Sequence, residues 1–464
     1  MVAFHLVKIG RKTNRYKNNN KKFFSLIIII FIRGVEFKTT VLTPRHQEVG
    51  LGYYYQGLVY KRMKRFEKAI EMLSLTLQIY DEATTPGTKT MIDLLSELAE
   101  CYEETGQHEK TIPLYARCSA IQKKALGPFH PSVAQSLASL AATQECMAQY
   151  DKAELLYQHC LSIQEQTLGK DHPKVSSTLS KMGNLYQKMG ALDKANEANA
   201  RAFAITEATL GKDHPDVATA LNNKAKLFEA MGKYDLALPL YERALSIRER
   251  YYGANHLEVA TTLNNMGVLY FSMGKLNVAE NLYKRALEIR ERVHGMDHPS
   301  VANVLNNLGV VYERNQDNDE ALQHHNQALS IQERQLGKSH PDVATTLNNK
   351  AVIAEKTKDF ETASQLYTRA LDIQEKTFGP DHPDVAIALN NQGALLKKMG
   401  KVVEALALFN RAADITSRKL GAEHPLSVAV AKNKADLCET TRHPILFFCF
   451  FPSFFFFYLN SASS

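Results

Sequence analysis

Hydrophobic residues recur at helical spacing along most of the chain, and residues 298–337 show the pattern clearly. The first apolar run of this segment has the spacing i, i+3, i+4 and i+7, which places its members on one face of a helix. These members are Leu305, Leu308, Gly309 and Tyr312. A polar turn at 315–318 follows, and Ala321, Ala328 and Leu329 then mark a second helix. The pattern predicts a unit of helix, turn and helix.

This unit recurs with a fixed period, because His-Pro pairs are spaced at multiples of 42 residues. The pairs begin at His130, His172, His214, His298, His340, His382 and His424, and His256-Leu257 fills the one gap. A glycine such as Gly337 suits the end of a second helix, and Pro299 suits the first turn of the next helix. A fixed period of this length is typical of an array in which each unit buries its apolar face by stacking on its neighbours.

The core positions follow the same frame throughout residues 50–440. A leucine takes the first core position in most first helices, and glycine or alanine follows four residues later, as in Leu221 and Ala225 or Leu263 and Gly267. We count about nine units of 42 residues plus a truncated tenth, and we expect one elongated all-α domain, since a solenoid grows by adding units to one core. Function is then expected on a repeated surface.

Net charge argues against nucleic acid as a partner. The chain has 464 residues and a formal charge of +7, but residues 1–48 alone hold 10 Lys or Arg against 2 Glu. The remaining 46 basic and 47 acidic residues leave the array close to neutral. A nucleic-acid-binding protein needs a basic stripe that displaces counterions from phosphates, so we expect no such binding.

Cysteine and histidine usage gives no sign of a metal or of disulfides. The six cysteines contain no CxxC pair, which favours a reduced, cytoplasmic protein. Equivalent histidines of adjacent units would be separated by two helix-packing steps of about 8 to 10 Å each, too far apart to share one metal. The chain lacks GxGxxG, GxxxxGK[ST], GxSxG and HExxH motifs, so we expect no cofactor and no enzymatic activity.

Both ends depart from the repeat pattern. Residues 1–48 form a basic leader of low complexity, and residues 441–464 form a Phe-rich tail. The apolar run in the leader is shorter than the roughly 20 residues of a membrane span, and Pro452 interrupts the tail. We expect neither segment to belong to the fold, and a membrane anchor in the tail remains an alternative.

The order of large residue, Leu, Gly or Ala, and Tyr, followed by Ala, aromatic and Ala, resembles the tetratricopeptide repeat (TPR), lengthened from 34 to 42 residues. The phrase LG-x-DHP-x-VA-x-x-LNN at 210–223 is similar to the repeats of kinesin light chains and nephrocystin-3. The resemblance covers residues 50–440. It implies an α-solenoid of right-handed superhelical form that binds peptides in its concave groove, with cytoskeletal or ciliary association.

Paired asparagines are the most regular residues on the side of the first helix that faces away from Leu305 and Leu308. The pairs are Asn222-Asn223, Asn264-Asn265, Asn306-Asn307, Asn348-Asn349 and Asn390-Asn391. Each amide supplies a donor and an acceptor, so the series is predicted to bind the backbone of an extended peptide. The alternative is that these asparagines bridge adjacent helices.

A second series consists of cations near the end of the first helix. Its members are Lys188, Arg314, Lys356 and Lys398, and Ala230 and Ser272 interrupt it. Basic groups in a neutral groove favour acidic peptides, and the resemblance to kinesin light chains implies acidic cargo motifs. The alternative is a solvated charged surface.

These observations predict a non-enzymatic scaffold or adaptor that binds peptide segments. A kinesin light chain would carry an N-terminal heptad coiled coil, which residues 1–48 do not show, whereas a long array fits nephrocystin-3 better. The alternative from another class is the sensing array of a signalling ATPase or enzyme whose catalytic domain lies outside this sequence.

Overall fold

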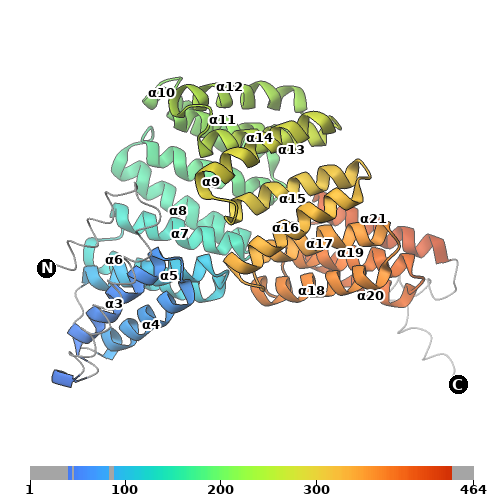
Figure 1. The fold of residues 1–464 in the computed structure, drawn as a ribbon. Coiled ribbons are helices and arrows are strands. Elements are labelled where there is room, and N and C mark those ends of the chain that lie inside the picture. The colour runs from blue at the N-terminus through green and yellow to red at the C-terminus, as the bar shows by residue number, and fades with distance from the viewer. Residues whose placement is uncertain (1–39, 44–45, 83–87, 442–464) are drawn as a thin grey trace, which may run out of the picture. The chain divides into compact units, whose positions relative to one another are not determined.

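The computed structural model describes residues 40–43, 46–82 and 88–441, and within them it contains helices α3 to α21 and no strand (Figure 1). The predicted all-α array of paired helices is thereby confirmed. The chain divides into two compact units, Met1–Thr178 and Leu179–Ser464, and the boundary falls inside α9.

The first unit holds three helix pairs, and α9 crosses into the second unit. The bounds are α3 (Gln47–Arg62), α4 (Phe66–Glu82), α5 (Thr88–Glu104), α6 (His108–Leu126), α7 (Pro131–Cys146), α8 (Tyr150–Leu168) and α9 (Pro173–Lys188).

The second unit continues the alternation of a shorter first helix and a longer second helix. The bounds are α10 (Leu192–Leu210), α11 (Pro215–Ala230), α12 (Tyr234–Tyr252), α13 (Leu257–Ser272), α14 (Leu276–His294), α15 (Pro299–Arg314), α16 (Asn318–Leu336), α17 (Pro341–Lys356), α18 (Phe360–Phe378), α19 (Pro383–Lys398), α20 (Val402–Leu420) and α21 (Pro425–Thr441).

Helix ends follow directly from the repeated His-Pro and Gly residues. The imidazole Nδ1 of His340 accepts the backbone N–H of Asp342 at 3.2 Å, which satisfies one of the unpaired donors of the helix start. The same cap forms at His46, His130, His172, His214, His256, His298, His382 and His424. Each second helix from α6 to α20 is followed by glycine at positive φ, such as Gly337 at 93°.

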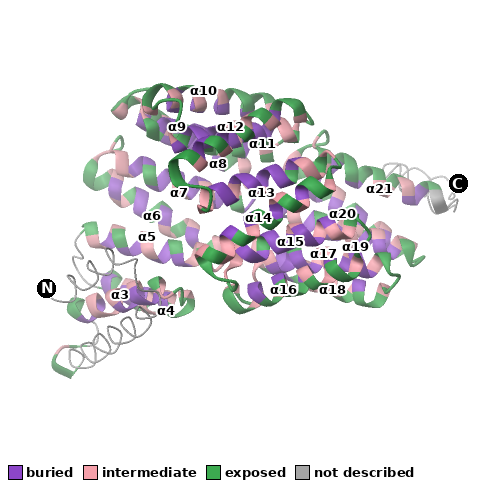
Figure 2. Cartoon of the chain, turned by 45° about the horizontal axis from the view of Figure 1, so that its top comes forward, coloured by how far each residue is buried: buried purple, intermediate pink, exposed green. Residues whose placement is uncertain are grey.

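The first helix of a repeat buries two faces. Val301, Ala302 and Leu305 of α15 pack against α16 within the same repeat. Val304, Leu308 and Val311 pack against residues of α13 and α14 in the preceding repeat. Figure 2 shows the buried residues between neighbouring helices and the exposed residues along turns and outer faces. A repeat therefore completes its core only when a neighbour is present.

The two helices of a repeat approach closely where the small residue lies. In α13, a Cβ added to Gly267 would lie 2.6 Å from Cε1 of Tyr283 in α14, a contact that is too short to tolerate without movement. Tyr283 is buried and cannot swing into solvent. The glycine is thus needed for close approach of the two helices.

The two terminal segments lie largely outside the described residues. Of the leader 1–48, the structure describes 40–43 and 46–48, where Gln47 and Glu48 already belong to α3. The tail 441–464 lies outside the described residues apart from Thr441. In the part of the chain that is described, no helix combines the length and apolarity needed to cross a bilayer.

We expect Gly267→Ala to lower the free energy of unfolding by about 1 to 3 kcal/mol, because the added methyl group overpacks the contact with Tyr283. Urea unfolding followed by circular dichroism measures the change. Val268→Ala is the control, since Val268 is exposed in the same helix and its truncation is expected to cost less than about 0.5 kcal/mol. Equal effects of the two substitutions would contradict the overpacking argument.

Candidate peptide-binding face

The candidate site lies on the side of the first helices that is left free by the two buried faces. In the second unit we define this first-helix face by Asn307, Val310 and Arg314 of α15 and by the equivalent residues of α11, α13, α17 and α19. Asn307 and Val310 are half-buried and Arg314 is exposed. The face therefore contains residues from both series that the sequence singled out.

The predicted asparagines divide into buried and half-buried members. Asn222, Asn265 and Asn306 are 4%, 9% and 7% exposed. The half-buried members are Asn223, Asn264, Asn307, Asn348, Asn349, Asn390 and Asn391. The helical projection placed Asn306 opposite the core, but the second buried face of α15 encloses it.

Several asparagines bridge adjacent first helices, as the alternative interpretation of the sequence anticipated. Asn307 donates to Asn264 Oδ1 at 2.9 Å, and Asn433 donates to Asn390 Oδ1 at the same distance. Asn222 donates to Thr262 Oγ1 at 3.3 Å. Peptide contact thus stays a prediction for this series, and it concerns chiefly the members without such a bond.

Asn306 belongs to a buried chain of hydrogen bonds between two repeats. Its amide donates to Thr346 Oγ1 at 2.6 Å, and its oxygen lies 2.9 Å from Nδ1 of His325. Thr346 in turn donates to Gln332 Oε1 at 2.6 Å. With the amide oxygen accepting, His325 is assigned the tautomer protonated on Nδ1. Burial lowers the pKa of His325 to about 4, so the ring is neutral.

The predicted cations differ in whether a carboxylate neutralises them. Lys356 forms an ion pair with Glu313, and Lys398 forms one with Glu355 at 2.6 Å. Lys188 is exposed. Arg314 is exposed as well, and among the described residues no carboxylate pairs with it. The residue 43 positions before Arg314 is Phe271, where the equivalent repeats have Glu313 and Glu355.

Sequence reasoning missed the glutamates that precede these cations. The hydroxyl of Tyr241 in α12 donates to Glu229 in α11 at 3.1 Å, and Tyr367 donates to Glu355 at 3.2 Å. Burial raises the pKa of Glu229, since the carboxylate loses hydration. The recurring Glu twelve residues before a second-helix Tyr was the available signal.

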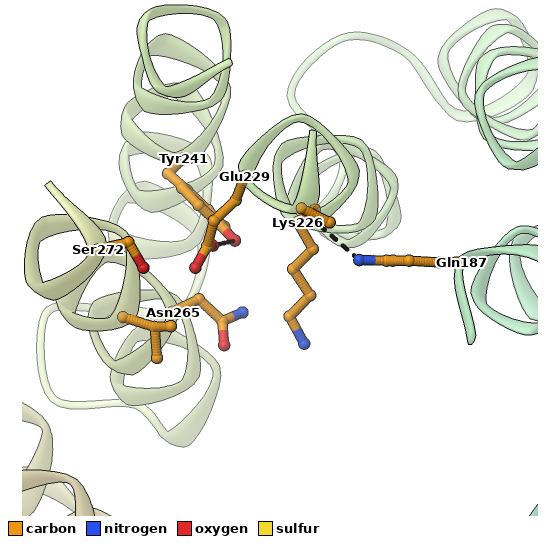
Figure 3. A pocket seen from close by; sticks show the side chains of 8 residues that line it. Gln187, Lys226, Glu229, Tyr241, Asn265 and Ser272 are labelled. Atoms are coloured by element: carbon orange, nitrogen blue, oxygen red, sulfur yellow. Dashed lines mark hydrogen bonds between the residues drawn. The ribbon is translucent and has the colours of Figure 1, made fainter. Parts of the chain in front are cut away.

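A cavity of about 450 Å³ opens in the first-helix face between α9, α11 and α13. Figure 3 shows Glu229 between Ser272 and Lys226, with the Asn265 amide beside them. Ala230 and Val268 also line the cavity, as does Gln187, which donates to the Lys226 carbonyl at 3.3 Å. The two positions that interrupt the predicted cation series, Ala230 and Ser272, thus coincide with this opening.

The repeated histidines act as helix caps, and among the described residues no three His, Cys, Asp or Glu side chains gather as metal ligands. The described cysteines are free thiols.

A tetratricopeptide repeat model matches the chain over residues 90–166, 147–208, 174–250, 216–292, 258–334, 300–376, 342–401 and 384–444. These overlapping matches span most of the sequence, and the chain therefore belongs to the tetratricopeptide repeat family. Arrays of this family are typically scaffolds for protein interactions and generally not catalytic.

Solved structures with a similar fold include BtubC (BKLC) from P. vanneervenii, with 27% identity and a TM-score of 0.40 over 51% of this chain and 92% of that one. A candidate kinesin light chain of Podosopora anserina with nearly identical TPR-like repeats has 24% identity and a TM-score of 0.38, over 45% and 99%. A Rap protein complexed with competence and sporulation factor has 12% identity and a TM-score of 0.47, over 81% and 99%. A search of curated proteins gives no match.

We expect Asn306→Ala to lower the free energy of unfolding by about 1 to 3 kcal/mol, because Thr346 and His325 lose a buried partner. Asn303→Ala in the same helix is the control, since Asn303 is exposed and its truncation is expected to change stability by less than about 0.5 kcal/mol. Urea unfolding compares the two variants. A loss no larger for Asn306→Ala than for the control would show that the network does not stabilise the fold.

His325 predicts a pH dependence of stability. Its pKa is about 4 in the fold and about 6.5 in an unfolded chain, so the unfolded state binds the proton first. The contribution of neutral His325 to the free energy of unfolding is complete above pH 6.5. It is lost as the pH falls toward 4, by on the order of 3 kcal/mol in total. The His325→Phe variant carries the residue that the last complete repeat has at the equivalent position, Phe409. We expect its free energy of unfolding to fall by about 2 kcal/mol less than that of the wild type between pH 7 and pH 4.5. Urea titrations at both pH values test this, and identical losses would contradict it.

Proposed function

We propose that this protein is a non-enzymatic scaffold that holds extended peptide segments of partner proteins along the first-helix face. The family supports this, because tetratricopeptide arrays are typically protein-interaction modules. An adaptor role like that of kinesin light chains or nephrocystin-3, in the cytoplasm, is part of the proposal. Its support is the phrase at 210–223 and the reduced state of the described cysteines.

The observation that carries the proposal is a set of unoccupied amides at one helix position. Asn223, Asn349 and Asn391 are half-buried, and none of them forms a hydrogen bond within the described part of the chain. They occupy the position of Asn307 in α11, α17 and α19. An extended peptide exposes a backbone donor and acceptor at each residue. The asparagine amides can form hydrogen bonds with both, whatever the side chains of the peptide are.

The charge of the peptide is proposed from the cations that remain available. Lys356 and Lys398 are neutralised within the array, so they attract an acidic peptide only weakly. Arg314 is exposed and unpaired among the described residues, and Phe271 stands where the glutamate partner would be. We place the contact with an acidic side chain at Arg314, where a planar guanidinium forms a bidentate pair with a carboxylate.

An array of synthetic peptides of about ten residues, probed with the full chain, tests this function. We expect Asn349→Ala combined with Asn391→Ala to lower binding about tenfold for all bound sequences, because two backbone contacts are lost. Arg314→Ala is expected to lower binding about fivefold, and only for peptides with Asp or Glu.

Two substitutions on exposed sites of second helices serve as controls. Asn326→Ala removes an amide from α16, and Arg292→Ala removes a guanidinium from α14. Neither is expected to alter peptide binding. Absence of any bound peptide, or equal effects of the control and test substitutions, would overturn the assignment to the first-helix face.

A further inference from the structure

Two repeats of the second unit contain an ion pair that a third repeat lacks. Glu313 pairs with Lys356 and Glu355 pairs with Lys398, and in both pairs the lysine follows the glutamate by 43 residues on the next first helix. The same offset places Ser272 opposite Glu229. Serine is short and uncharged, so the position that an ammonium fills in two repeats is vacant beside Glu229.

Glu229 has the environment of its paired counterparts without their cation. Like Glu355, it accepts a hydrogen bond from a second-helix tyrosine, Tyr241 at 3.1 Å. Among the described residues, no Lys, Arg or His forms an ion pair with it. A half-buried carboxylate has lost part of its hydration, and an incoming cation restores the lost stabilisation.

The cavity next to Glu229 has the size and lining that a lysine side chain requires. Its volume is about 450 Å³, and Ala230 and Ser272 leave room where Arg314, Lys356 and Lys398 project in other repeats. Val268 is exposed and offers apolar surface to an aliphatic stem. The amide of Asn265 lines the same cavity, and an amide at this place can both donate to and accept from a peptide backbone.

Lys226 is the one basic side chain that lines the cavity, as far as the described residues show. It is exposed, it lies three residues before Glu229 in α11, and its charge acts on Glu229 from outside ion-pair distance. This lysine is a competitor for the carboxylate. A ligand cation must compete with the weak attraction between Lys226 and Glu229, so removal of Lys226 should strengthen ligand binding.

We propose that the cavity at Ser272 receives a lysine side chain from a partner's peptide, whose ammonium pairs with Glu229 as Lys356 and Lys398 pair with Glu313 and Glu355. The proposal rests on the proposed function, since the peptide backbone must lie along the first-helix face. The array thereby prefers peptides that place a basic residue at this one repeat. Charge complementarity, together with the lysines that the chain itself places at this position, identifies the occupant.

The next repeat has the opposite vacancy, because Arg314 faces Phe271 where a glutamate would be. The first helices of adjacent repeats contact each other directly, as the hydrogen bond from Asn307 to Asn264 shows, so they are separated by one helix-packing step of about 8 to 10 Å. An extended peptide spans this distance with about three residues. The preferred ligand therefore carries a lysine and an acidic residue at about that separation.

A peptide array in which one position is lysine, norleucine or glutamate and the others are randomised tests the proposal with the full chain. Norleucine keeps the aliphatic stem without the charge. On the wild type we expect lysine peptides to bind about tenfold better than norleucine peptides. Glu229→Gln, which can still accept from Tyr241, is expected to reduce this ratio to about one. Ser272→Lys is expected to do the same by filling the cavity with an internal cation.

Three further variants separate the proposed contact from general effects. Glu355→Gln is the matched control, because it alters the equivalent hydrogen bond from Tyr367 in a repeat whose cation position is filled by Lys398. The lysine preference should persist in this variant. Lys226→Gln should raise the preference about two- to threefold. Lys398→Ser in the Glu229→Gln background opens the equivalent position beside Glu355 and should restore a lysine preference.

The outcomes distinguish the two proposals. Bound peptides without any lysine preference, or a preference that Glu229→Gln leaves intact, would overturn the lysine site and leave the scaffold function standing. Absence of all peptide binding would overturn both. Equal binding of butylamine and of lysine peptides, with the same dependence on Glu229, would show a site for free amines in place of a peptide side chain.

Discussion

The packing of each first helix against the preceding repeat, chiefly against its second helix, is the interaction on which the rest of this structure depends. α15 contacts its own second helix through Leu305 and the preceding repeat through Val304, Leu308 and Val311. Removing the neighbour would expose these residues, each worth about 1.5 to 3 kcal/mol of burial. No single repeat completes a core, so stability is a property of consecutive repeats and extends along the array through nearest neighbours.

This packing also fixes which polar residues meet. A constant period brings each position of one first helix against a defined position of the next, so a residue copied into several repeats acquires a copied partner. Asn307 meets Asn264, Asn433 meets Asn390, and Lys398 meets Glu355. Donors therefore meet acceptors and cations meet anions within the array, and much of the regular polar pattern is used for cohesion between repeats.

In the proposed function, recognition resides where the repetition is broken. Among the residues that the structure describes, Ser272 leaves Glu229 without an ion-pair partner, and Phe271 leaves Arg314 without a carboxylate. An external ligand has to compete with an internal ion-pair partner wherever the pattern is complete, whereas at these interruptions it meets at most the weak attraction between Lys226 and Glu229. We therefore propose that specificity for one partner is determined by departures from the repeat pattern at a few positions of the first-helix face.

The sequence by itself determined the class of fold, the helix pairs and their ends. Hydrophobic spacing, the His caps and the glycines at positive φ act within a few residues of one another, so local chemistry is sufficient to predict them. The sequence also indicated the relevant stretch of the first helix, including the gaps at Ala230 and Ser272. Only the tertiary structure decided which of these residues are free of internal partners and so available to a ligand.

A projection of one helix assumes one buried face, whereas α15 has two, and Asn306 lies in the second. Lys356 and Lys398 seemed equivalent to Arg314 along the chain, yet glutamates on the preceding first helix neutralise these two lysines, and no described carboxylate pairs with Arg314. These pairings join residues more than 40 positions apart, and their existence depends on the offset between stacked helices, which no local pattern specifies.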